Sequence, residues 1–389
     1  MLSINNLNLG SGKISQVSIN ETVNYELIYS YLKNNIDLFK SINVQINDEY
    51  SNKLIKYIEE KNNYLELLIN KHVEIFIINN LPDVEKNFNY LIFRLKFLIA
   101  GREKINLGYP PYLLIEPVST CNLRCPFCFQ VDKSFTKKPY MGIMKFELFT
   151  KIIDEANKLK IGAVTLASRG EPTLHKELDK MLDYLGTQKN IFEIKLNTNG
   201  SFLNEKICHS IFKNNLSQIV ISADHYIKED YEKLRVNSNF EKILKNVDFL
   251  FNLRKKQYPN SRTEIRVSGI DNEKKLDKNK FKHFWIQRSD HVTSSYPLER
   301  WNTYLNPIHE EINDACENFW DRLYIWFDGT CNPCDADYKS YLNFGNFTDC
   351  SIEEIWNNKK IGKLRKDHLN NLRSKHNPCD RCGVTFKCK

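Results

Sequence analysis

The chain has 389 residues, of which 41% are hydrophobic and 27% are charged, and its formal net charge is +8. This length allows two or three domains with a sizeable buried core, and the composition excludes a disordered chain. The Lys and Arg residues are scattered without any long block of like charges, and no nucleic-acid-binding motif accompanies them, so we expect no nucleic-acid partner.

The sequence contains no apolar run long enough to cross a membrane, and its first residues lack the basic-then-apolar order of a signal peptide. We therefore expect a cytoplasmic protein without a membrane partner. Its 11 cysteines then indicate metal binding or redox chemistry, because disulfides do not persist in a reducing compartment.

Residues 21–100 carry apolar side chains at helical spacing, as in Leu54, Ile55 and Ile58, and contain no glycine. This pattern predicts several helices, which we assign to a helical N-terminal domain over residues 1–105. The segment 101–112 contains glycine and proline and interrupts the pattern, so we place the first domain boundary there.

Between residues 106 and 300, short apolar runs alternate with longer amphipathic ones, which is typical of β-α units in a parallel sheet. Strands are expected at 112–117, 163–167, 192–196, 218–222 and 263–267, and helices at 146–159, 174–185, 204–213 and 240–253. Loops that follow parallel strands gather at one end of the sheet, where the active sites of barrel enzymes lie. The region therefore predicts an α/β fold with a site at the carboxyl ends of its strands.

The alternation stops near Trp301, and residues 301–389 are rich in cysteine and aromatic side chains. A short extended run at 323–327 is followed by Asp328 and Gly329, which form a strong turn signal, and then by a second extended run. We expect a β-hairpin there, within a small C-terminal domain.

Cys121, Cys125 and Cys128 form a CxxxCxxC pattern directly after the first predicted strand. The loop offers three thiolates and no fourth ligand close by, whereas a [4Fe-4S] cube needs four ligands. One iron would stay open to bind a small molecule through groups such as an amine and a carboxylate. A zinc site is the alternative, but zinc prefers four ligands arranged in pairs.

This loop, including Phe127 before the last cysteine, resembles the cluster loop of the radical S-adenosylmethionine (radical SAM) enzymes. The resemblance implies a partial (β/α)6 barrel, with S-adenosylmethionine (SAM) on the open iron and an electron donor such as flavodoxin or ferredoxin. In that family, reductive cleavage of SAM gives a 5'-deoxyadenosyl radical that takes a hydrogen atom from the substrate. The cofactor supplies this chemistry and the protein positions it.

Residues 168–172 follow the second predicted strand and resemble the GGEP motif of that family. The resemblance implies that Gly170 and Glu171 contact the amino group of SAM, while Arg169 replaces a glycine that is common in the family. Turn or helix-cap roles stay open as the alternative for polar residues at later strand ends. The further SAM contacts that the resemblance implies come from Asn197, Asn199, Ser222 and Arg235. Arg235 is the candidate partner of a carboxylate, because a guanidinium forks onto carboxylates.

Four C-terminal cysteines resemble the ligands of a SPASM or shorter Twitch domain, namely Cys316, Cys334, Cys379 and Cys382. The resemblance implies one auxiliary [4Fe-4S] cluster, held by a β-hairpin and a short helix. Four cysteines also suit a tetrahedral zinc ion, which stays open as an alternative. Cys331 lies near the predicted substrate face and is a candidate hydrogen-atom donor, although non-ligand cysteines are commonly inert.

Three functional interpretations follow. The first is a radical SAM enzyme of oxidoreductase type that oxidises or rearranges a small or carrier-presented substrate, because a fully ligated auxiliary cluster suits an electron acceptor. The second is a radical SAM maturase or epimerase of a ribosomally made peptide. The third is a non-enzymatic iron-sulfur or zinc protein, which would not need polar side chains at the ends of successive strands.

Overall fold

The computed structural model describes residues 23–43, 48–271, 275–297, 303–308 and 314–382. The chain divides into two compact units between Leu107 and Gly108. Among the described residues, the first unit contains only helices, and the second contains the sheet and every cysteine.

The first unit consists of α1 (Tyr25–Asn43), α2 (Glu49–Glu59), α3 (Asn63–Leu68), α4 (Lys71–Asn79) and α5 (Val84–Glu103). Its core contains the apolar residues at helical spacing, including Leu54 and Ile58, which are both 0% exposed. Asn62, Asn70 and Asp83 each precede a helix and accept a hydrogen bond from a backbone N–H of its first turn. The structure confirms the predicted helical character of this region.

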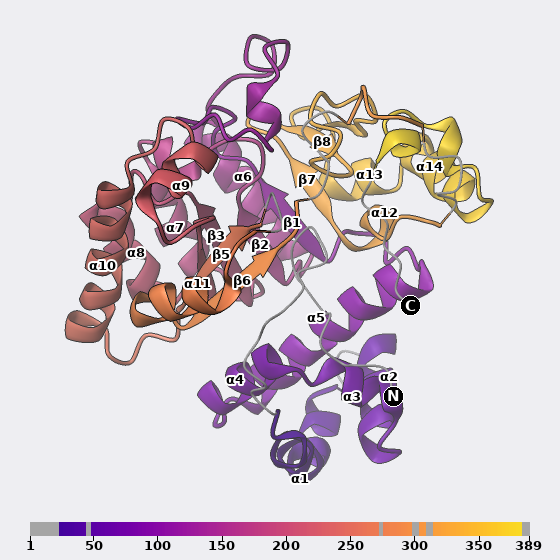
Figure 1. Cartoon of the computed structure of the whole chain (residues 1–389). Helices are drawn as coiled ribbons and strands as arrows, with labels where there is room; N and C mark the ends of the chain where they lie inside the picture. The colour runs from indigo at the N-terminus through magenta and orange to yellow at the C-terminus, as the bar shows by residue number, and fades with distance from the viewer. Residues whose placement is uncertain (1–22, 44–47, 272–274, 298–302, 309–313, 383–389) are drawn as a thin grey trace. The chain divides into compact units, whose positions relative to one another are not determined.

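The second unit contains one nine-stranded sheet in the order β6-β5-β4-β3-β2-β1-β7-β8-β9. Its strands are β1 (Tyr112–Ile115), β2 (Ala163–Leu166), β3 (Glu193–Thr198), β4 (Gln218–Ser222), β5 (Glu264–Ile270), β6 (His291–Ser295), β7 (Leu323–Ile325), β8 (Thr330–Asn332) and β9 (Gly345–Asn346). Strands β1 to β6 are parallel, β7 pairs in parallel with β1, and β8 and β9 are antiparallel to their neighbours. The barrel sheet therefore continues into the C-terminal hairpin (Figure 1).

Helices pack against one face of the parallel strands, as Figure 1 shows for α6 (Phe146–Lys158), α7 (Leu178–Gly186), α8 (Glu205–Lys213), α9 (Lys228–Leu234), α10 (Phe240–Gln257) and α11 (Lys278–Trp285). Apolar side chains such as Ile194 and Leu196 are buried on this face. Alternate residues of the same strand, such as Lys195 and Asn197, face the opposite side and are half-buried. This opposite face is the interior of a partial barrel.

The C-terminal extension contains α12 (Asn318–Asp321), α13 (Ile352–Trp356) and α14 (Lys359–Leu369), with short 3-10 turns η4 (Arg373–Lys375) and η5 (Cys379–Arg381). The predicted hairpin is present between β7 and β8. Gly329 in its turn has a φ of +85°, which favours glycine, and the Thr330 N–H donates to Asp328 Oδ1 at 3.0 Å.

Some elements differ from those predicted. Strand β6 was not predicted, because its sequence is polar and lacks an apolar run. Helix α7 begins at Leu178 rather than at residue 174, because Pro172–Leu174 forms a separate 3-10 turn. Helices α9 and α11 are short and were also not predicted.

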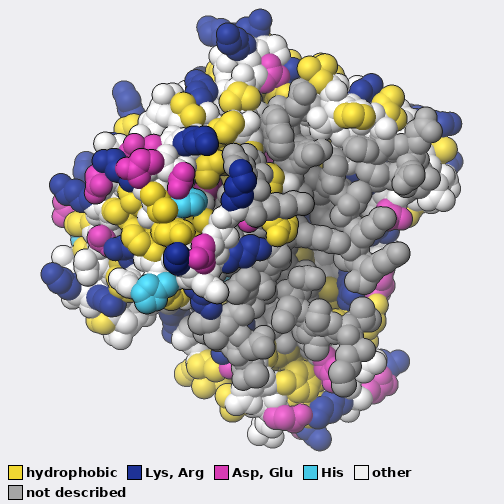
Figure 2. Space-filling model, in the orientation of Figure 1, with side chains coloured by type: hydrophobic (Ala, Val, Ile, Leu, Met, Phe, Trp, Pro, Cys, Tyr) yellow, Lys and Arg dark blue, Asp and Glu magenta, His cyan; other side chains and the backbone are white. Residues whose placement is uncertain are grey.

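Figure 2 shows Lys and Arg side chains spread over the described surface in view, interspersed with Asp and Glu. This distribution matches the scattered charges of the sequence. None of the helices in the described ranges is both long and apolar enough to cross a membrane.

Candidate active site

The CxxxCxxC loop lies between β1 and α6, at the carboxyl end of the parallel strands. Cys125 is 6% exposed, and burial raises the pKa of Cys121 to about 11 and that of Cys128 to about 12. The charges of neighbouring thiols also raise these pKa values, so the three sulfur groups lie close together. Metal binding would replace the thiol protons, because thiolates are the ligand form of cysteine.

Arg235 places a positive charge beside this loop. Its Nε and Nη2 donate to the carboxylate of Asp224 at 2.5 and 2.9 Å, and its guanidinium lies 5.7 Å from the centre of the Phe127 ring. The same cation lowers the pKa of all three thiols and so opposes the effect of burial. The sequence suggested Arg235 as a partner of the SAM carboxylate. In the structure, two of its N–H donors already bind the carboxylate of Asp224.

Gly170 lies where the loop after β2 touches the chain that leads to the cysteines. A Cβ at this position would stand 2.1 Å from the Val118 carbonyl oxygen and 2.6 Å from that of Thr120, so a larger residue does not fit. The N–H of the next residue, Glu171, donates to the Thr120 carbonyl at 2.9 Å. These contacts fix the two loops against each other directly before Cys121.

The buried carboxylate of Glu171 joins the ends of β2 and β3. Its Oε1 accepts hydrogen bonds from the hydroxyls of Thr173 and Thr198, both at 2.6 Å, and its Oε2 accepts the Asn199 N–H at 2.7 Å. Burial raises the pKa of Glu171, and these hydrogen bonds oppose that shift. Glu171 therefore orders the loops around the cysteines.

Asn197, Asn199 and Ser222 are the three other polar side chains that the sequence predicted as SAM contacts. Asn199 Nδ2 donates to Asn122 Oδ1 at 2.9 Å and lies 3.9 Å from Cys121 Sγ. Asn197 faces the barrel interior, and its Oδ1 has no hydrogen-bond partner among the described residues. Ser222 is the last residue of β4. Asn199 is thus the one that contacts the cysteine loop.

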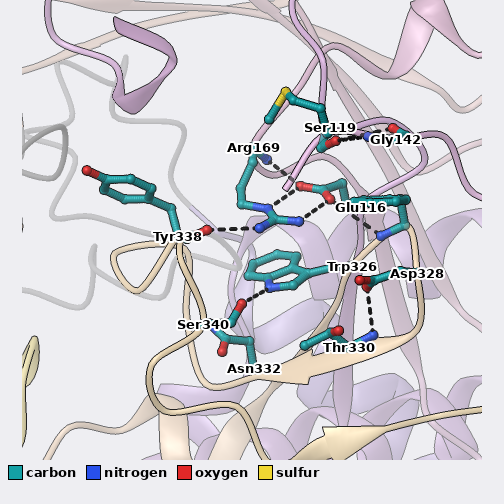
Figure 3. Close-up of polar contacts among 12 residues, drawn as sticks. Glu116, Ser119, Gly142, Arg169, Trp326, Asp328, Thr330, Asn332, Tyr338 and Ser340 are labelled. Atoms are coloured by element: carbon teal, nitrogen blue, oxygen red, sulfur yellow. Dashed lines mark hydrogen bonds and ion pairs between the residues drawn. The ribbon is translucent and has the colours of Figure 1, made fainter. Parts of the chain in front are cut away.

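Arg169, which departs from the GGEP pattern, forms the buried network shown in Figure 3. Its Nε and Nη2 donate to the two carboxylate oxygens of Glu116, both at 2.6 Å, and its Nη1 donates to the Tyr338 carbonyl at 2.8 Å. Its guanidinium lies 4.1 Å from the centre of the Trp326 ring. Arg169 and Glu116 are 3% and 0% exposed, so the ion pair is almost fully desolvated.

This network connects the barrel to the C-terminal extension. Glu116 and Arg169 follow β1 and β2, whereas Tyr338 follows β8. The Tyr338 ring stacks on that of Phe129, the residue after Cys128, with 5.0 Å between ring centres. The cysteine loop and the extension therefore share one packed interface.

The extension gathers a second group of thiols, from Cys316, Cys334, Cys379 and Cys382. Cys316 precedes α12, Cys334 follows β8, and the other two lie at η5. Burial raises the pKa of Cys334 well above its usual value, and the charges of the other three thiols raise it further. The structure thus brings together the four cysteines that the sequence assigned to an auxiliary cluster.

Two basic side chains accompany this second group. The charges of all four cysteines raise the pKa of Arg373, which is 2% exposed. The Cys316 N–H donates to Nδ1 of His368 at 3.2 Å, and burial lowers the pKa of His368 to about 3. The imidazole is therefore neutral near pH 7 and accepts this hydrogen bond, while Arg373 balances the charge of thiolates.

Within the described ranges, no three Cys, His, Asp or Glu side chains converge as a mononuclear metal site requires. In a [4Fe-4S] cube each cysteine binds a different iron, so its ligand sulfurs stand further apart than those around one zinc ion. The lack of a mononuclear metal site in the described ranges therefore does not conflict with a cluster at either group of thiols.

Cys331, the candidate hydrogen-atom donor, lies in the core of the extension. It is 0% exposed, and its thiol donates to the Gly329 carbonyl at 3.5 Å. Burial raises its pKa, and the nearby charges that act on it come from Asp328 and Glu155 rather than from another cysteine. This placement favours an inert Cys331 over a hydrogen-atom donor.

Sequence reasoning missed four ionisable side chains of these groups: Glu116, Asp224, His368 and Arg373. An acidic residue directly after an apolar strand, as in Ile115 and Glu116, is the one local signal that points to such a role. The partners of the other residues lie too far away in the sequence to form a motif.

Comparison with known protein families gives two matches. Residues 115–277 match the Radical SAM superfamily, and residues 316–383 match the SPASM iron-sulfur cluster-binding domain. The first match contains the CxxxCxxC loop, and the second contains all four gathered C-terminal cysteines.

Curated relatives have different activities. The chain is 23% identical over 296 residues to the GTP 3',8-cyclase of Clostridium botulinum (strain Okra / Type B1), and the match covers 64% of this chain and 90% of that protein. It is 33% identical over 151 residues to the cysteine-type anaerobic sulfatase-maturating enzyme of Clostridium novyi (strain NT), a match that covers 36% and 40% of the two chains.

Solved structures with a similar fold include SuiB of Streptococcus suis bound to S-adenosylmethionine, with a TM-score of 0.52, 14% identity and 87% of each chain covered. BtrN in complex with AdoMet and 2-DOIA has a TM-score of 0.50 and 17% identity, with 70% of this chain and 92% of that chain covered. At these identities the likeness shows the fold alone.

Proposed function

Because the chain belongs to the radical SAM superfamily and carries a SPASM domain, we propose that it oxidises or rearranges a small or carrier-presented substrate. Its cofactors are a catalytic [4Fe-4S] cluster, SAM and an auxiliary iron-sulfur cluster. When bound, they supply a 5'-deoxyadenosyl radical that removes a hydrogen atom from the substrate. The observation that carries the proposal is the packing of two cysteine groups into one unit.

The cysteine groups divide between the two clusters. The loop after β1 provides three thiolates, which leave one iron open for SAM, and the extension provides four, which close the second cluster. The assignment supports a catalytic cluster on Cys121, Cys125 and Cys128, and an auxiliary cluster on Cys316, Cys334, Cys379 and Cys382.

Neighbouring side chains orient and shield the catalytic site. Gly170 allows the loop after β2 to approach the cysteine loop, and Glu171 fixes the ends of β2 and β3. Arg235 and Phe127 lie beside the thiols, where the guanidinium offsets the negative charge of a thiolate-bound cluster. The Asn199 side chain donates a hydrogen bond to Asn122 and so fixes the cysteine loop.

The four-cysteine set favours oxidation over the other reactions. An auxiliary cluster with four protein ligands has no open iron for substrate, so it suits electron transfer. Removal of one hydrogen atom and then of one proton and one electron amounts to a two-electron oxidation. We propose reduced flavodoxin or ferredoxin as the donor of the electron that cleaves SAM.

A peptide maturase is the second candidate. The match to a sulfatase-maturating enzyme favours it, because that relative acts on a protein. The first unit of this chain contains only helices in its described part, unlike the winged-helix leader-binding domain, with its three-stranded sheet, that peptide maturases often carry. We therefore place the small-substrate reaction first.

The test uses the anaerobically reconstituted full chain with SAM, dithionite and deuterium-labelled candidate substrates. Deuterium in 5'-deoxyadenosine from a small or carrier-bound compound, with a product lacking two hydrogen atoms, supports oxidation, and an isomeric product supports rearrangement. Transfer from peptides alone supports the maturase instead. Absence of 5'-deoxyadenosine with every substrate contradicts both candidates.

A further inference from the structure

A surface pocket of about 580 Å³ lies where the loops after β2 and β3 meet the N-terminal parts of α8 and α10. Its lining includes three lysines, Lys176, Lys206 and Lys242, which are all exposed. Among the described residues that line it, Asp179 is the only acidic one. The pocket lining therefore carries more positive than negative charge.

The three lysines have no carboxylate partner within the described ranges. Each is next to a glutamate in the sequence, but these glutamates contact other basic residues. The contacts are Glu177 with Lys180 at 2.9 Å, Glu205 with His209 at 3.6 Å, and Glu241 with Lys228 at 3.7 Å. The ammonium groups around the pocket can therefore pair with carboxylates of another protein.

The wall of the pocket reaches the cysteine loop. The Ser201 N–H donates to Asn199 Oδ1 at 2.9 Å, and Nδ2 of the same amide lies 3.9 Å from Cys121 Sγ. One side-chain amide thus connects the pocket lining to a cysteine of the catalytic loop. The Thr173 hydroxyl donates to Glu171 Oε1 at 2.6 Å, a second contact between the lining and this corner. Because electron tunnelling slows steeply with distance, this wall offers a short route to a cluster on the loop.

Two exposed apolar side chains belong to the same region of the chain. Phe202 also lines the pocket and is 40% exposed, and Lys242 Nζ lies 4.6 Å from the centre of its ring. Val236, between α9 and α10, is 39% exposed, and its carbonyl accepts the Arg124 N–H of the cysteine loop at 3.0 Å. Apolar side chains with a charged surround are typical of the surfaces on which proteins dock.

We propose that this surface docks an acidic flavodoxin that reduces the catalytic cluster. The docking surface comprises Lys176, Lys206, Lys242, Phe202 and Val236. Carboxylates beside the flavin pair with the lysines, and the Phe202 ring contacts the apolar edge of the flavin. The anionic flavin hydroquinone loses one electron and becomes the neutral semiquinone, and the oxidised cluster gains that electron. This inference rests on the proposed function, because cleavage of SAM requires the electron.

The test compares two reductants with the same reconstituted full chain and SAM. One is dithionite, and the other is flavodoxin reduced by its reductase and NADPH. At low ionic strength, Lys206→Glu and Lys242→Glu should each raise the KM for flavodoxin at least fivefold, because they place a negative charge opposite the donor. The rate of 5'-deoxyadenosine formation with dithionite should not change. The matched control is Lys255→Glu in the last turn of α10, which should keep the wild-type KM.

Binding is measured separately, by calorimetry with oxidised flavodoxin, so that this result does not depend on turnover. The dissociation constant should rise at least fivefold in Lys206→Glu and stay at the wild-type value in Lys255→Glu. Equal affinity of all variants overturns the docking surface, and so does a wild type that binds ferredoxin but no flavodoxin. Failure of the wild type to form 5'-deoxyadenosine with dithionite would instead count against the proposed function.

Discussion

Arg169 donates two hydrogen bonds of 2.6 Å to Glu116, so that a guanidinium replaces a common glycine of the GGEP motif and closes a buried, bidentate ion pair. The same guanidinium also donates to the Tyr338 carbonyl and lies over the Trp326 ring. One side chain thus joins the loop after β2 to the extension. The departure from the motif is therefore a structural connection between the two cysteine groups.

Glu116→Gln should strongly destabilise this interface, because it leaves the Arg169 charge buried without its counter-ion. Loss of one partner of a buried pair costs about 3 to 5 kcal/mol. We expect the thermal unfolding midpoint of the second unit to fall by several degrees. Asp248→Asn provides the control, since the Arg288–Asp248 pair is partly exposed and should contribute less than about 1 kcal/mol. Equal effects of the two variants would contradict the assigned role of Arg169.

Gly170→Ala should weaken SAM binding while the chain still folds. The added Cβ would stand 2.1 Å from the Val118 carbonyl oxygen, so the loop after β2 must move away from the cysteine loop. We expect at least a tenfold rise in the SAM dissociation constant, measured by equilibrium binding. Gly362→Ala is the matched control, because no atom lies within 4 Å of its added Cβ and alanine favours the helix α14. Unchanged SAM affinity in Gly170→Ala would refute the close approach.

Cys334→Ala should separate the roles of the two clusters. The variant loses one of the four thiols gathered in the extension, whereas the loop after β1 stays intact. We expect reductive cleavage of SAM to continue and substrate turnover to fall at least a hundredfold. Cys350→Ala, which changes an exposed cysteine, should behave as the wild type. Full turnover by Cys334→Ala would show that the auxiliary site is only structural.

His368 should make stability depend on pH. Burial lowers its pKa from 6.5 to about 3, so the unfolded chain binds a proton below pH 6.5 that the folded chain does not. The contribution of neutral His368 is complete above pH 6.5 and falls by about 1 kcal/mol for each pH unit below it. Between pH 7.5 and 5.5 the melting midpoint of the wild type should fall further than that of His368→Gln. Equal falls in the wild type and in His368→Gln would contradict a buried, neutral His368.

Local sequence patterns predicted most of the barrel, because its helices and apolar strands have clear periods. Strand β6 escaped prediction because its residues are polar, as in Thr293, and a partly solvated interior face tolerates them. The pairing of β7 with β1 also escaped, since Leu113 and Leu323 are joined only by the tertiary fold. Pairings of this kind have no local signal.

The residues of the candidate site also divide into those with a local sequence signal and those without one. The cysteines and Gly170 stand in short motifs, so spacing identified them. Spacing did not identify Glu116, the partner of Arg169, because Glu116 follows β1 whereas Arg169 follows β2. The two residues form an ion pair only when these strands align. Arg235 was identified as a carboxylate partner, but no sequence pattern indicated that Asp224 would occupy its fork.

The central claim is that the loop after β1 holds the catalytic cluster and the extension holds a separate one. The most direct measurement is iron and sulfide content per chain together with 5'-deoxyadenosine formation, compared between the wild type and Cys125→Ala after anaerobic reconstitution. We expect about eight irons and 5'-deoxyadenosine for the wild type, and about four irons without 5'-deoxyadenosine for the variant, at four irons per cube. Intact SAM cleavage by Cys125→Ala, or zinc in place of iron in the wild type, would contradict the account.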